Sequence, residues 1–345
     1  MQNQPKFTVI IPNYNGLKFM ENCMTALKKQ SYTSFAVLNV DNGSSDGSRE
    51  YLEQLASADL PFPVRNLFLE TNTGFSGAVN AGIAAAETEF VVLLNNDTEA
   101  DPDYLKELAA VLEEDTEGRI FAVSPKMIQL YHPELLDDAG DGYNLLGWAF
   151  QRGVGQPVSA GKFSRRTEVF SACAGAAAYR KAILEEIAFA GEENAYFDPL
   201  HFAYLEDLDV SFRARIRGYR ILYAPQSKVL HVGSGTSGSK YNSFKVRLAA
   251  RNNIYLNYKN MPLLMLLLNM PGILCGILIK QLFFIRRGFG KDYAEGLAEG
   301  IRTLRGCRKH KTPFCISRLG NYLKIEAMMI GDTFSYIQDF LTRHL

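Results

Sequence analysis

Polar side chains follow each of four short apolar segments near the N-terminus, and their types suit the binding of phosphate, ribose and a metal ion. The segments are 7–11, 35–40, 64–69 and 90–94, and each has the largely apolar, β-branched character of a buried parallel strand. The residues after them, at 12–16, 41–48, 70–77 and 95–98, are rich in Asn, Asp, Gly and Ser. One such cluster is ordinary turn chemistry. Four at the carboxyl edge of one parallel sheet predict a polar binding site on a rigid scaffold.

These residue types fit a nucleoside diphosphate. Asp41 is suited to hydrogen-bond a base or a ribose, and the small residues and backbone donors near Gly74 can approach phosphate. Asp97 offers a hard oxygen ligand for Mg²⁺ or Mn²⁺ that bridges two phosphates. The segment 12–16 is not G-x-G-x-x-G, and the chain contains no G-x-x-x-x-G-K-[ST], so a dinucleotide fold and a P-loop are disfavoured.

A second group of acidic residues, Glu206, Asp207 and Asp209, crowds the start of a helix expected at 206–217. Complementation of the helix dipole explains any one of them. It explains three, preceded by aromatic residues, less well. A carboxylate placed here is a candidate general base whose pKa its acidic neighbours tune.

Helical patterns at 17–30, 48–56, 77–87 and 104–114 alternate with the four strands, which predicts a parallel sheet covered on both faces. The pattern loosens into glycine-rich loops and short strands at 139–161. Beyond the helix at 206–217, strands are expected at 220–223, ended by Pro225, and at 228–232. A flexible loop is expected at 233–239.

The 345 residues include 37 basic and 37 acidic side chains, a balance that excludes a generally basic nucleic-acid binder. The five cysteines are scattered without a C-x-x-C, which argues against a disulfide framework or structural zinc site and favours a reducing compartment. Residues 1–6 are polar and lead directly into a strand, so no signal peptide is expected.

The charge is unevenly divided along the chain. Residues 240–345 carry a surplus of 11 positive charges, and residues 1–239 carry an equal negative surplus. Residues 261–279 contain no charge and are long enough to span a bilayer. Because Asn269, Pro271, Gly272 and Gly276 interrupt this run, we expect a Pro-broken pair of half-helices lying in the interface of an anionic membrane. One spanning helix, a buried core helix, a dimerisation surface and an ordinary helical cap are the alternatives.

Together, these motifs resemble the inverting glycosyltransferases of family two, which have the GT-A fold, and most closely their rhamnosyltransferase-like branch. The likeness extends over about residues 7–255. The matching segments, in family order, are 9–15, 41–48, 72–75 with Asn80 and Gly82, 94–97, 197–198, 204–209 with Arg213, His231, and 251–252.

The resemblance implies that Asp41 binds the nucleoside. Asn95, Asn96 and Asp97 would take the place of the family's D-x-D, with Asp97 on the metal. One departure is Asn95, which is neutral where many relatives carry the first Asp. The charge of the metal must then be balanced by Asp97 and by the diphosphate itself.

The resemblance further implies that Asp207, beside Glu206, is the catalytic base and that His231 lies near the diphosphate or on the metal. Arg251 would stabilise the leaving diphosphate. The full donor-binding set would be Pro12, Asn13, Tyr14, Asn15, Asp41, Ser44, Asn72, Gly74, Phe75, Asn80, Asn95, Asn96 and Arg251. Pro199 and His201 stand where relatives often show Glu and Phe, so His201 is either a structural histidine or part of acceptor choice.

We therefore expect an α/β, GT-A-type, mostly parallel sheet with helices on both faces in residues 1–239. Its nucleotide-sugar half would lie at about 1–125 and its acceptor half at about 126–239, followed by a helical, basic, membrane-associating region at 240–345.

The expected activity is metal-dependent, inverting sugar transfer that uses Mn²⁺ or Mg²⁺, with L-rhamnose from dTDP-rhamnose as the favoured donor. The acceptor would be a glycan or a polyprenyl-linked sugar in cell-surface polysaccharide synthesis, at the cytoplasmic face of a prokaryotic cell membrane. No nucleic-acid partner is expected, and the oligomeric state stays open. A sugar nucleotidyltransferase, which normally needs a basic glycine-rich loop after the first strand, and a non-catalytic glycan- or nucleotide-binding membrane module are the alternatives.

Overall fold

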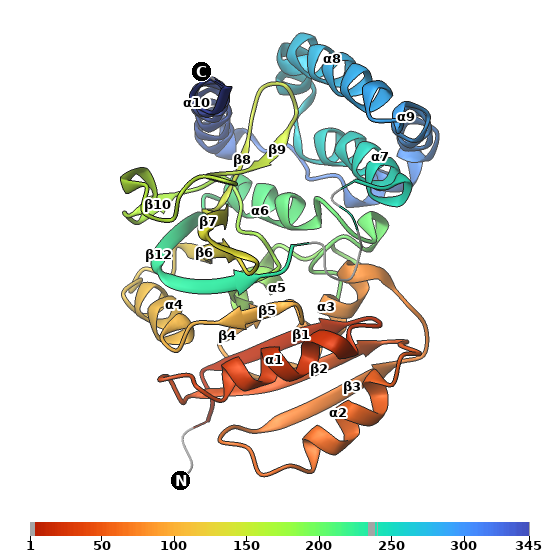
Figure 1. Cartoon of the computed structure of the whole chain (residues 1–345). Coiled ribbons are helices and arrows are strands. Elements are labelled where there is room, and N and C mark those ends of the chain that lie inside the picture. Colours follow the sequence, from red (N-terminus) through yellow and green to blue (C-terminus); the bar gives the residue numbers. More distant parts are fainter. Residues whose placement is uncertain (1–3, 234–238, 240, 345) are drawn as a thin grey trace.

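A mixed ten-stranded sheet forms the centre of the molecule, and a group of C-terminal helices caps it (Figure 1). The computed structural model of the chain describes residues 4–233, 239 and 241–344. The strand order is β10-β12-β6-β11-β4-β1-β2-β3, with β5 paired to β12 and β7 paired to β6. The strands are β1 (Phe7–Asn13), β2 (Phe35–Asn42), β3 (Val64–Leu69), β4 (Phe90–Leu93), β5 (Thr98–Ala100), β6 (Ile120–Gln129), β7 (His132–Asp138), β8 (Asp141–Tyr143), β9 (Ala149–Gln151), β10 (Thr167–Glu168), β11 (Ala178–Arg180) and β12 (Arg220–His231). The α-helices are α1 (Leu17–Leu27), α2 (Ser48–Ala56), α3 (Gly74–Ala85), α4 (Tyr104–Glu113), α5 (Lys181–Glu186), α6 (Glu206–Arg217), α7 (Ser243–Asn260), α8 (Leu263–Arg286), α9 (Gly290–Thr303) and α10 (Leu319–His344).

The predicted alternation of strands and helices in the N-terminal part is confirmed. Strands β1 to β4 pair in parallel, and their register places Asn13 at the end of β1 beside Asp41 at the end of β2. Strand β1 extends two residues beyond its predicted end, and α3 begins at Gly74 rather than at residue 77. Beyond β4 the sheet becomes mixed, because β11 pairs antiparallel with both β4 and β6.

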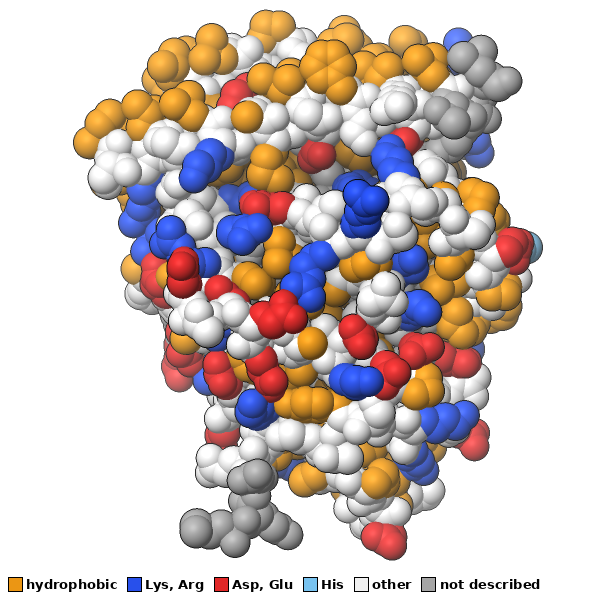
Figure 2. Space-filling model, turned by 90° about the vertical axis from the view of Figure 1, so that its left-hand side faces the viewer, with side chains coloured by type: hydrophobic (Ala, Val, Ile, Leu, Met, Phe, Trp, Pro, Cys, Tyr) orange, Lys and Arg blue, Asp and Glu red, His pale blue; other side chains and the backbone are white. Residues whose placement is uncertain are grey.

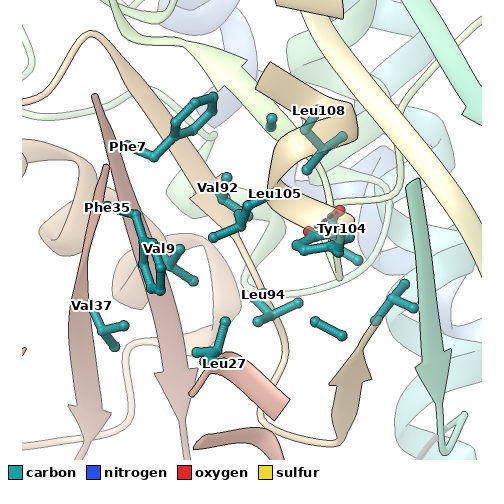
Figure 3. Packing of buried hydrophobic residues seen from close by; sticks show 14 of the residues in the cluster. Phe7, Val9, Leu27, Phe35, Val37, Val92, Leu94, Tyr104, Leu105 and Leu108 are labelled. Atoms are coloured by element: carbon teal, nitrogen blue, oxygen red, sulfur yellow. Dashed lines mark hydrogen bonds between the residues drawn. The ribbon is translucent and has the colours of Figure 1, made fainter. Parts of the chain in front are cut away.

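The two faces of the sheet carry separate apolar cores because side chains alternate along each strand. Phe7 and Val9 of β1 point to the face covered by α1 and α4, where they pack with Leu27 and Leu105 (Figure 3). Ile10 points to the opposite face, where α3 packs. This double cover holds the carboxyl ends of the strands rigidly at one edge.

The C-terminal end of the sheet differs from prediction at β12. The sequence predicts two strands separated at Pro225, but the structure has one strand from Arg220 to His231 that pairs with β6. The register shifts between Ala224 and Lys228, so Pro225 sits in an irregularity and no ladder hydrogen bond is needed from it. The predicted short strands within 139–161 are present as the β8–β9 hairpin. Most of the loop predicted at 233–239 lies outside the described residues.

The predicted break in residues 261–279 is wrong. Helix α8 is continuous over 24 residues with Pro271 inside it. Gly272 and Gly276 serve packing instead, because a Cβ at these positions would lie 2.5 Å and 2.1 Å from the carbonyl oxygens of Leu145 and Leu146. The glycines thus let α8 approach the β8–β9 hairpin closely, and the exposed Pro271 lies away from that contact.

Buried charges join α7 to α6 and to the loop before it. Lys259 of α7 forms ion pairs with Asp198 and Asp209, and its Nζ lies 2.8 Å from Asp209 Oδ1. Arg213 Nε lies 3.1 Å from Asp209 Oδ2, and His310 Nδ1 lies 2.9 Å from Asp198 Oδ1. Burial works against ionisation of Asp198, but Lys259 holds the pKa of this carboxyl well below its usual range. The C-terminal helices are therefore anchored to the sheet-bearing part through paired, desolvated charges.

Replacing Lys259 by methionine would leave Asp198 and Asp209 buried without their shared cation. Because buried carboxylates that lose a partner do not regain their hydration, we expect Lys259→Met to lower the free energy of unfolding by about 3–5 kcal/mol. Urea unfolding followed by circular dichroism measures the loss. Lys291→Met, at a side chain that is 89% exposed, is the control. A loss below about 1 kcal/mol in Lys259→Met, the range of exposed pairs, would contradict the assignment.

Candidate active site

The carboxyl ends of β1 and β2 meet in a compact set of side-chain hydrogen bonds. Asn13 Nδ2 donates to Asp41 Oδ1 at 3.1 Å and to Ser44 Oγ at 3.2 Å, and the Ser44 amide donates to Asp41 Oδ2 at 3.1 Å. The Asn15 amide donates to Ser44 Oγ at 2.9 Å, and Asn15 Oδ1 accepts from the Ser45 amide at 2.8 Å. Four predicted donor-binding residues are thus brought together, and Asp41 is held in one orientation.

The end of β4 joins this set through Asn96. Its Nδ2 donates to Asn13 Oδ1 at 2.6 Å, although the two residues are 83 positions apart in the chain. Gly16 provides the space, because a Cβ there would lie 1.9 Å from Asn96 Nδ2. Asn13 is therefore shared between Asp41 and Asn96, while the neighbouring Tyr14 is 38% exposed.

The residues predicted after β3 position the segment that leads into α6. Asn72 Oδ1 accepts from the Gly74 amide at 2.9 Å, and the Asn80 amide group makes two hydrogen bonds of 2.8 Å with the backbone of Phe197. A Cβ at Gly74, whose φ is +76°, would lie 2.4 Å from the carbonyl oxygen of Phe202. Donor binding by Asn72, Gly74 and Asn80 stays a prediction.

Asp97 and His231, the two residues that the sequence assigns to a metal, lie side by side. His231 Nε2 is 3.4 Å from Asp97 Oδ1, and its Nδ1 is 2.7 Å from Asp137 Oδ2. Burial disfavours the charged ring, but hydrogen bonds with Asp137 and Asp97 raise the pKa of His231 to about 10. The imidazolium therefore balances two carboxylates in the structure.

This donor set fits a divalent cation. Asp97 supplies a hard carboxylate oxygen of the kind that Mn²⁺ and Mg²⁺ prefer, and His231 supplies a ring nitrogen once its proton leaves. A cation at Asp97 would take over the charge balance that the imidazolium now provides.

Glu206 and Asp207 begin α6 in different environments. Asp207 is partly exposed, and it accepts hydrogen bonds from the Leu208 amide at 2.8 Å and from the Ala174 amide at 3.3 Å. Glu206 is 6% exposed, and its Oε2 has no hydrogen-bond partner among the described residues. Burial and the neighbouring Asp207 raise the pKa of Glu206 well above its usual range. Burial also raises the pKa of Asp207, although the two amides oppose that rise. Asp207 is therefore the better placed of the two to act as a base.

A short loop before β11 connects Asp207 with the end of β4. The Asn95 amide donates to Gly175 O at 2.8 Å, and the adjacent Ala174 amide donates to Asp207. A Cβ at Gly175 would lie 3.0 Å from Asn95 Nδ2, so the two segments are in close contact. Asp209, the third acid of this group, is instead fully buried in the ion pairs that anchor α7.

The loop before α6 is strained, and two residues of α7 hold it. Phe202, Tyr204 and Leu205 have φ values of 62°, 71° and 66°, which is costly for residues with a Cβ. Asn252 Nδ2 donates to three carbonyl groups of this loop at 2.8–2.9 Å, and Arg251 Nη2 donates to two at 3.0 Å. Arg251 thus positions the loop, and its predicted contact with the leaving diphosphate stays a prediction.

Three further side chains singled out in the sequence lie at the margin of these contacts. His201 is fully buried, and burial together with Lys259 lowers its pKa to about 4. Neither ring nitrogen of His201 has a hydrogen-bond partner of normal geometry among the described residues, so its role, structural or in acceptor choice, stays a prediction. Pro12 lies within β1, and Phe75 packs against the core beneath α3.

Sequence reasoning missed an acidic and thiol cluster beside Asp207. One ligand atom from each of Asp138, Asp141 and Cys173 lies within 4.8 Å of the others. Asp138 is completely buried, and neither carboxylate oxygen has a hydrogen-bond partner of normal geometry among the described residues. Burial, then Asp137 and Asp207, raise the pKa of Asp138 to about 7. The available signal was three acids within five residues at 137–141, in a stretch without helical or strand periodicity.

The raised pKa of Asp138 makes a pH-dependent prediction. The folded state keeps this proton up to about pH 7, whereas an unfolded Asp loses it near about pH 4, so stability falls as pH rises through that window. Because asparagine carries no charge, Asp138→Asn should raise the melting temperature by a few degrees at pH 8 and change it little at pH 4.5. Thermal melts across this range test it, with Glu134→Gln, at an exposed position of β7, as control. An effect of Asp138→Asn that is the same at every pH would contradict the prediction.

Comparison with known sequences identifies the family. Residues 8–188, just over half of the chain, match the family described as Glycosyl transferase family 2. An uncharacterized glycosyltransferase of Nostoc sp., alr2836, is 33% identical over 108 residues, which are 31% of this chain and 33% of that protein. The poly(ribitol-phosphate) beta-N-acetylglucosaminyltransferase TarS of Staphylococcus aureus is 35% identical over 112 residues, or 32% of this chain and 19% of TarS. The chain thus matches about a third or less of the length of these curated relatives.

Solved structures share the fold over most of the chain. Residues 1–349 of S. aureus TarS, in complex with UDP, align with a TM-score of 0.51 at 17% identity and cover 90% of this chain and 94% of that one. The mannosyltransferase PcManGT from Pyrobaculum calidifontis, in complex with GDP-Man and Mn²⁺, aligns with a TM-score of 0.51 at 14% identity and covers 88% of each chain. The chain therefore belongs to glycosyl transferase family 2 and has a GT-A fold with additional C-terminal helices.

Proposed function

We propose that the chain transfers a sugar from a nucleoside-diphosphate donor to an acceptor hydroxyl, with inversion at the anomeric carbon. The observation that carries this proposal is the series of hydrogen bonds along the sheet edge from Asp41 through Asn13 to Asn96, which directly precedes Asp97 in the chain. From Asn95 the series continues through a short loop to Asp207. A nucleoside, a diphosphate with its cation, and an acceptor hydroxyl would follow one another in the same order.

The residues of the chain suit a single displacement. The acceptor oxygen attacks the anomeric carbon from the face opposite the diphosphate, and the bond from that carbon to the diphosphate breaks with its electron pair. Asp207, oriented by two backbone amides, takes the acceptor proton as the new bond forms. Burial and Asp207 raise the pKa of Glu206 well above its usual range, which favours its neutral form and leaves Asp207 as the base.

Charge on the departing diphosphate must be compensated. Asp97 and His231 would hold Mn²⁺ or Mg²⁺, which when bound supplies positive charge to the diphosphate oxygens. Asn95, being neutral, adds no negative charge at this point. Asp41 is held by Asn13 and by the Ser44 amide in a fixed orientation for the nucleoside.

The surface of the C-terminal helices supports an acceptor that is located in a membrane. Of the exposed large apolar side chains in the described part of the chain, all but Tyr14, Tyr131 and Phe244 follow residue 262. They gather as an orange band along the top of the molecule in Figure 2, over helices that belong to the basic region 240–345. Helix α8 is also long and apolar enough to cross a membrane. We propose that this face rests on an anionic cytoplasmic leaflet, where the acceptor is a lipid-linked glycan.

The sugar and the base of the donor are open to direct screening. UDP-sugars are the first donors to test, because the TarS structure that shares this fold holds UDP. The relatives reported above do not carry rhamnosyltransferase names, so the dTDP-rhamnose expectation remains a secondary arm of the same screen. No specific feature of the site favours a sugar nucleotidyltransferase. A non-catalytic module would have no need for the orientation of Asp207.

Asp207→Asn tests the proposal. The amide cannot accept the acceptor proton, so we expect transfer to fall by about 10²–10⁴-fold while donor affinity stays within about twofold. Calorimetric titration with UDP and Mn²⁺ measures binding, and release of nucleoside diphosphate from sugar donors with membrane extract as acceptor source measures transfer. Glu50→Gln, at an exposed position of α2, is the matched control. Normal turnover by Asp207→Asn would reject Asp207 as the base.

A further inference from the structure

A cavity of about 170 Å³ lies between the C-terminal helices and the sheet-bearing part of the molecule. Its walls come from α7, α8 and α9 and from the tip of the β8–β9 hairpin, and they are mostly apolar. At one end it reaches Leu205, which directly precedes Glu206 and Asp207. The cavity is therefore adjacent to the helix that carries the proposed base.

One cation enters this apolar space. Lys280 projects from the inner face of α8, which also carries Gly276 and Phe284 against the protein. Its Nζ lies 5.5 Å from the centre of the Trp148 ring, and it has no ion pair or hydrogen bond among the described residues. Burial without a compensating carboxylate lowers the pKa of Lys280 to about 8. Lys280 is half-buried, and an ammonium group that loses part of its hydration against apolar walls is stabilised when an anion joins it.

The orientation of α8 determines how deep Lys280 would lie relative to a membrane. The outer face of the helix exposes Leu267, Leu274 and Leu278, whereas Lys280 faces inward. A helix that lies on a bilayer buries its apolar face roughly 5–10 Å into the boundary between headgroups and acyl chains. The inner face of such a helix lies at the level of the lipid phosphates. Lys280, on that face, would therefore lie at the depth of a phosphate group attached to a lipid.

We propose that this cavity binds the diphosphate and first isoprene units of a polyprenyl-diphosphate-linked acceptor, with Lys280 on the diphosphate and the apolar walls around the chain. The attached sugar would then extend past Leu205 toward Asp207. The proposal deepens the proposed function, on which it rests for the identity of the acceptor. A bilayer phospholipid offers the same phosphate chemistry, and the experiment separates the two.

Trp148 makes the test direct, because it is the one tryptophan of the chain and it lines the cavity. Its ring is held by a hydrogen bond from Nε1 to Gly276 O at 3.2 Å. Farnesyl diphosphate titrated into the full-length protein should change Trp148 fluorescence saturably. Farnesol and inorganic diphosphate should bind at least about tenfold more weakly, because each offers only one half of the interaction. Short-chain dihexanoyl phosphatidylglycerol should bind as weakly as farnesol and inorganic diphosphate.

Three variants sharpen the measurement. Lys280→Gln should weaken farnesyl diphosphate binding about tenfold or more, whereas Lys280→Arg, which keeps the charge, should retain it. Lys291→Gln removes a charge from the same basic region at an exposed position and should bind farnesyl diphosphate as the wild type does. All variants should sediment to the same extent with vesicles of phosphatidylglycerol and phosphatidylcholine. If the missing charge of Lys280→Gln weakens vesicle binding, Lys291→Gln should show the same loss.

Several results would overturn the proposal: no saturable response to farnesyl diphosphate, equal binding by Lys280→Gln and wild type, or equal affinity for dihexanoyl phosphatidylglycerol. None of these measurements needs a sugar donor or turnover. If the protein binds farnesyl diphosphate but transfers no sugar, the proposed function is wrong and the cavity assignment stands. If it transfers sugar but does not bind farnesyl diphosphate, the cavity assignment is wrong and the proposed function stands.

Discussion

The concentration of negative charge at one edge of the sheet is the constraint on which the rest of the site depends. The carboxyl groups gathered there are Asp41, Asp97, Asp137, Asp138, Asp141, Glu206 and Asp207. The fold holds His231 as a cation between Asp97 and Asp137, and burial raises the pKa of Glu206 and of Asp138, which favours their neutral forms. An edge of this kind repels a diphosphate unless a divalent cation accompanies it, which is the physical reason that a metal is expected.

Rigid backbone supports this unfavourable arrangement. Parallel register sets the ends of β1 and β2 side by side, and Gly16 allows Asn96 to reach them. The strained loop before α6 is held by hydrogen bonds from Arg251 and Asn252 to its carbonyl groups, while Lys259 of the same helix pairs with Asp198 nearby in the chain. The C-terminal helices therefore have two functions in this account. They fix the proposed base, and they present an apolar face with a lysine-bearing cavity behind it.

The sequence predicted what local patterns determine and missed what distant segments determine. Continuous apolar runs located β1 to β4, and the polar residues after them, including Asp41 and Asp97, lie at one edge as expected. The break predicted at Pro271 was wrong because the glycines beside it pack on Leu145 and Leu146, more than 120 positions earlier. The cluster around Asp138 was missed because its residues come together only when the β7–β9 segment folds against β11 and α6. Which of the acids at the start of α6 stays free also depended on a distant partner, since Lys259 pairs with Asp209 and not with Asp207.

The central claim is that one continuous surface binds the nucleoside, the cation and the acceptor hydroxyl. The most direct measurement is a crystal structure of the full chain with UDP and Mn²⁺, with the metal located by its anomalous scattering. The account predicts the uridine against Asp41, the anomalous peak at Asp97 and His231 in contact with the diphosphate, and the Asp207 carboxylate on the side of the diphosphate where the sugar would lie. A metal peak at Asp138 and Cys173 instead, or a nucleotide bound away from Asp41 and Asp97, would contradict it.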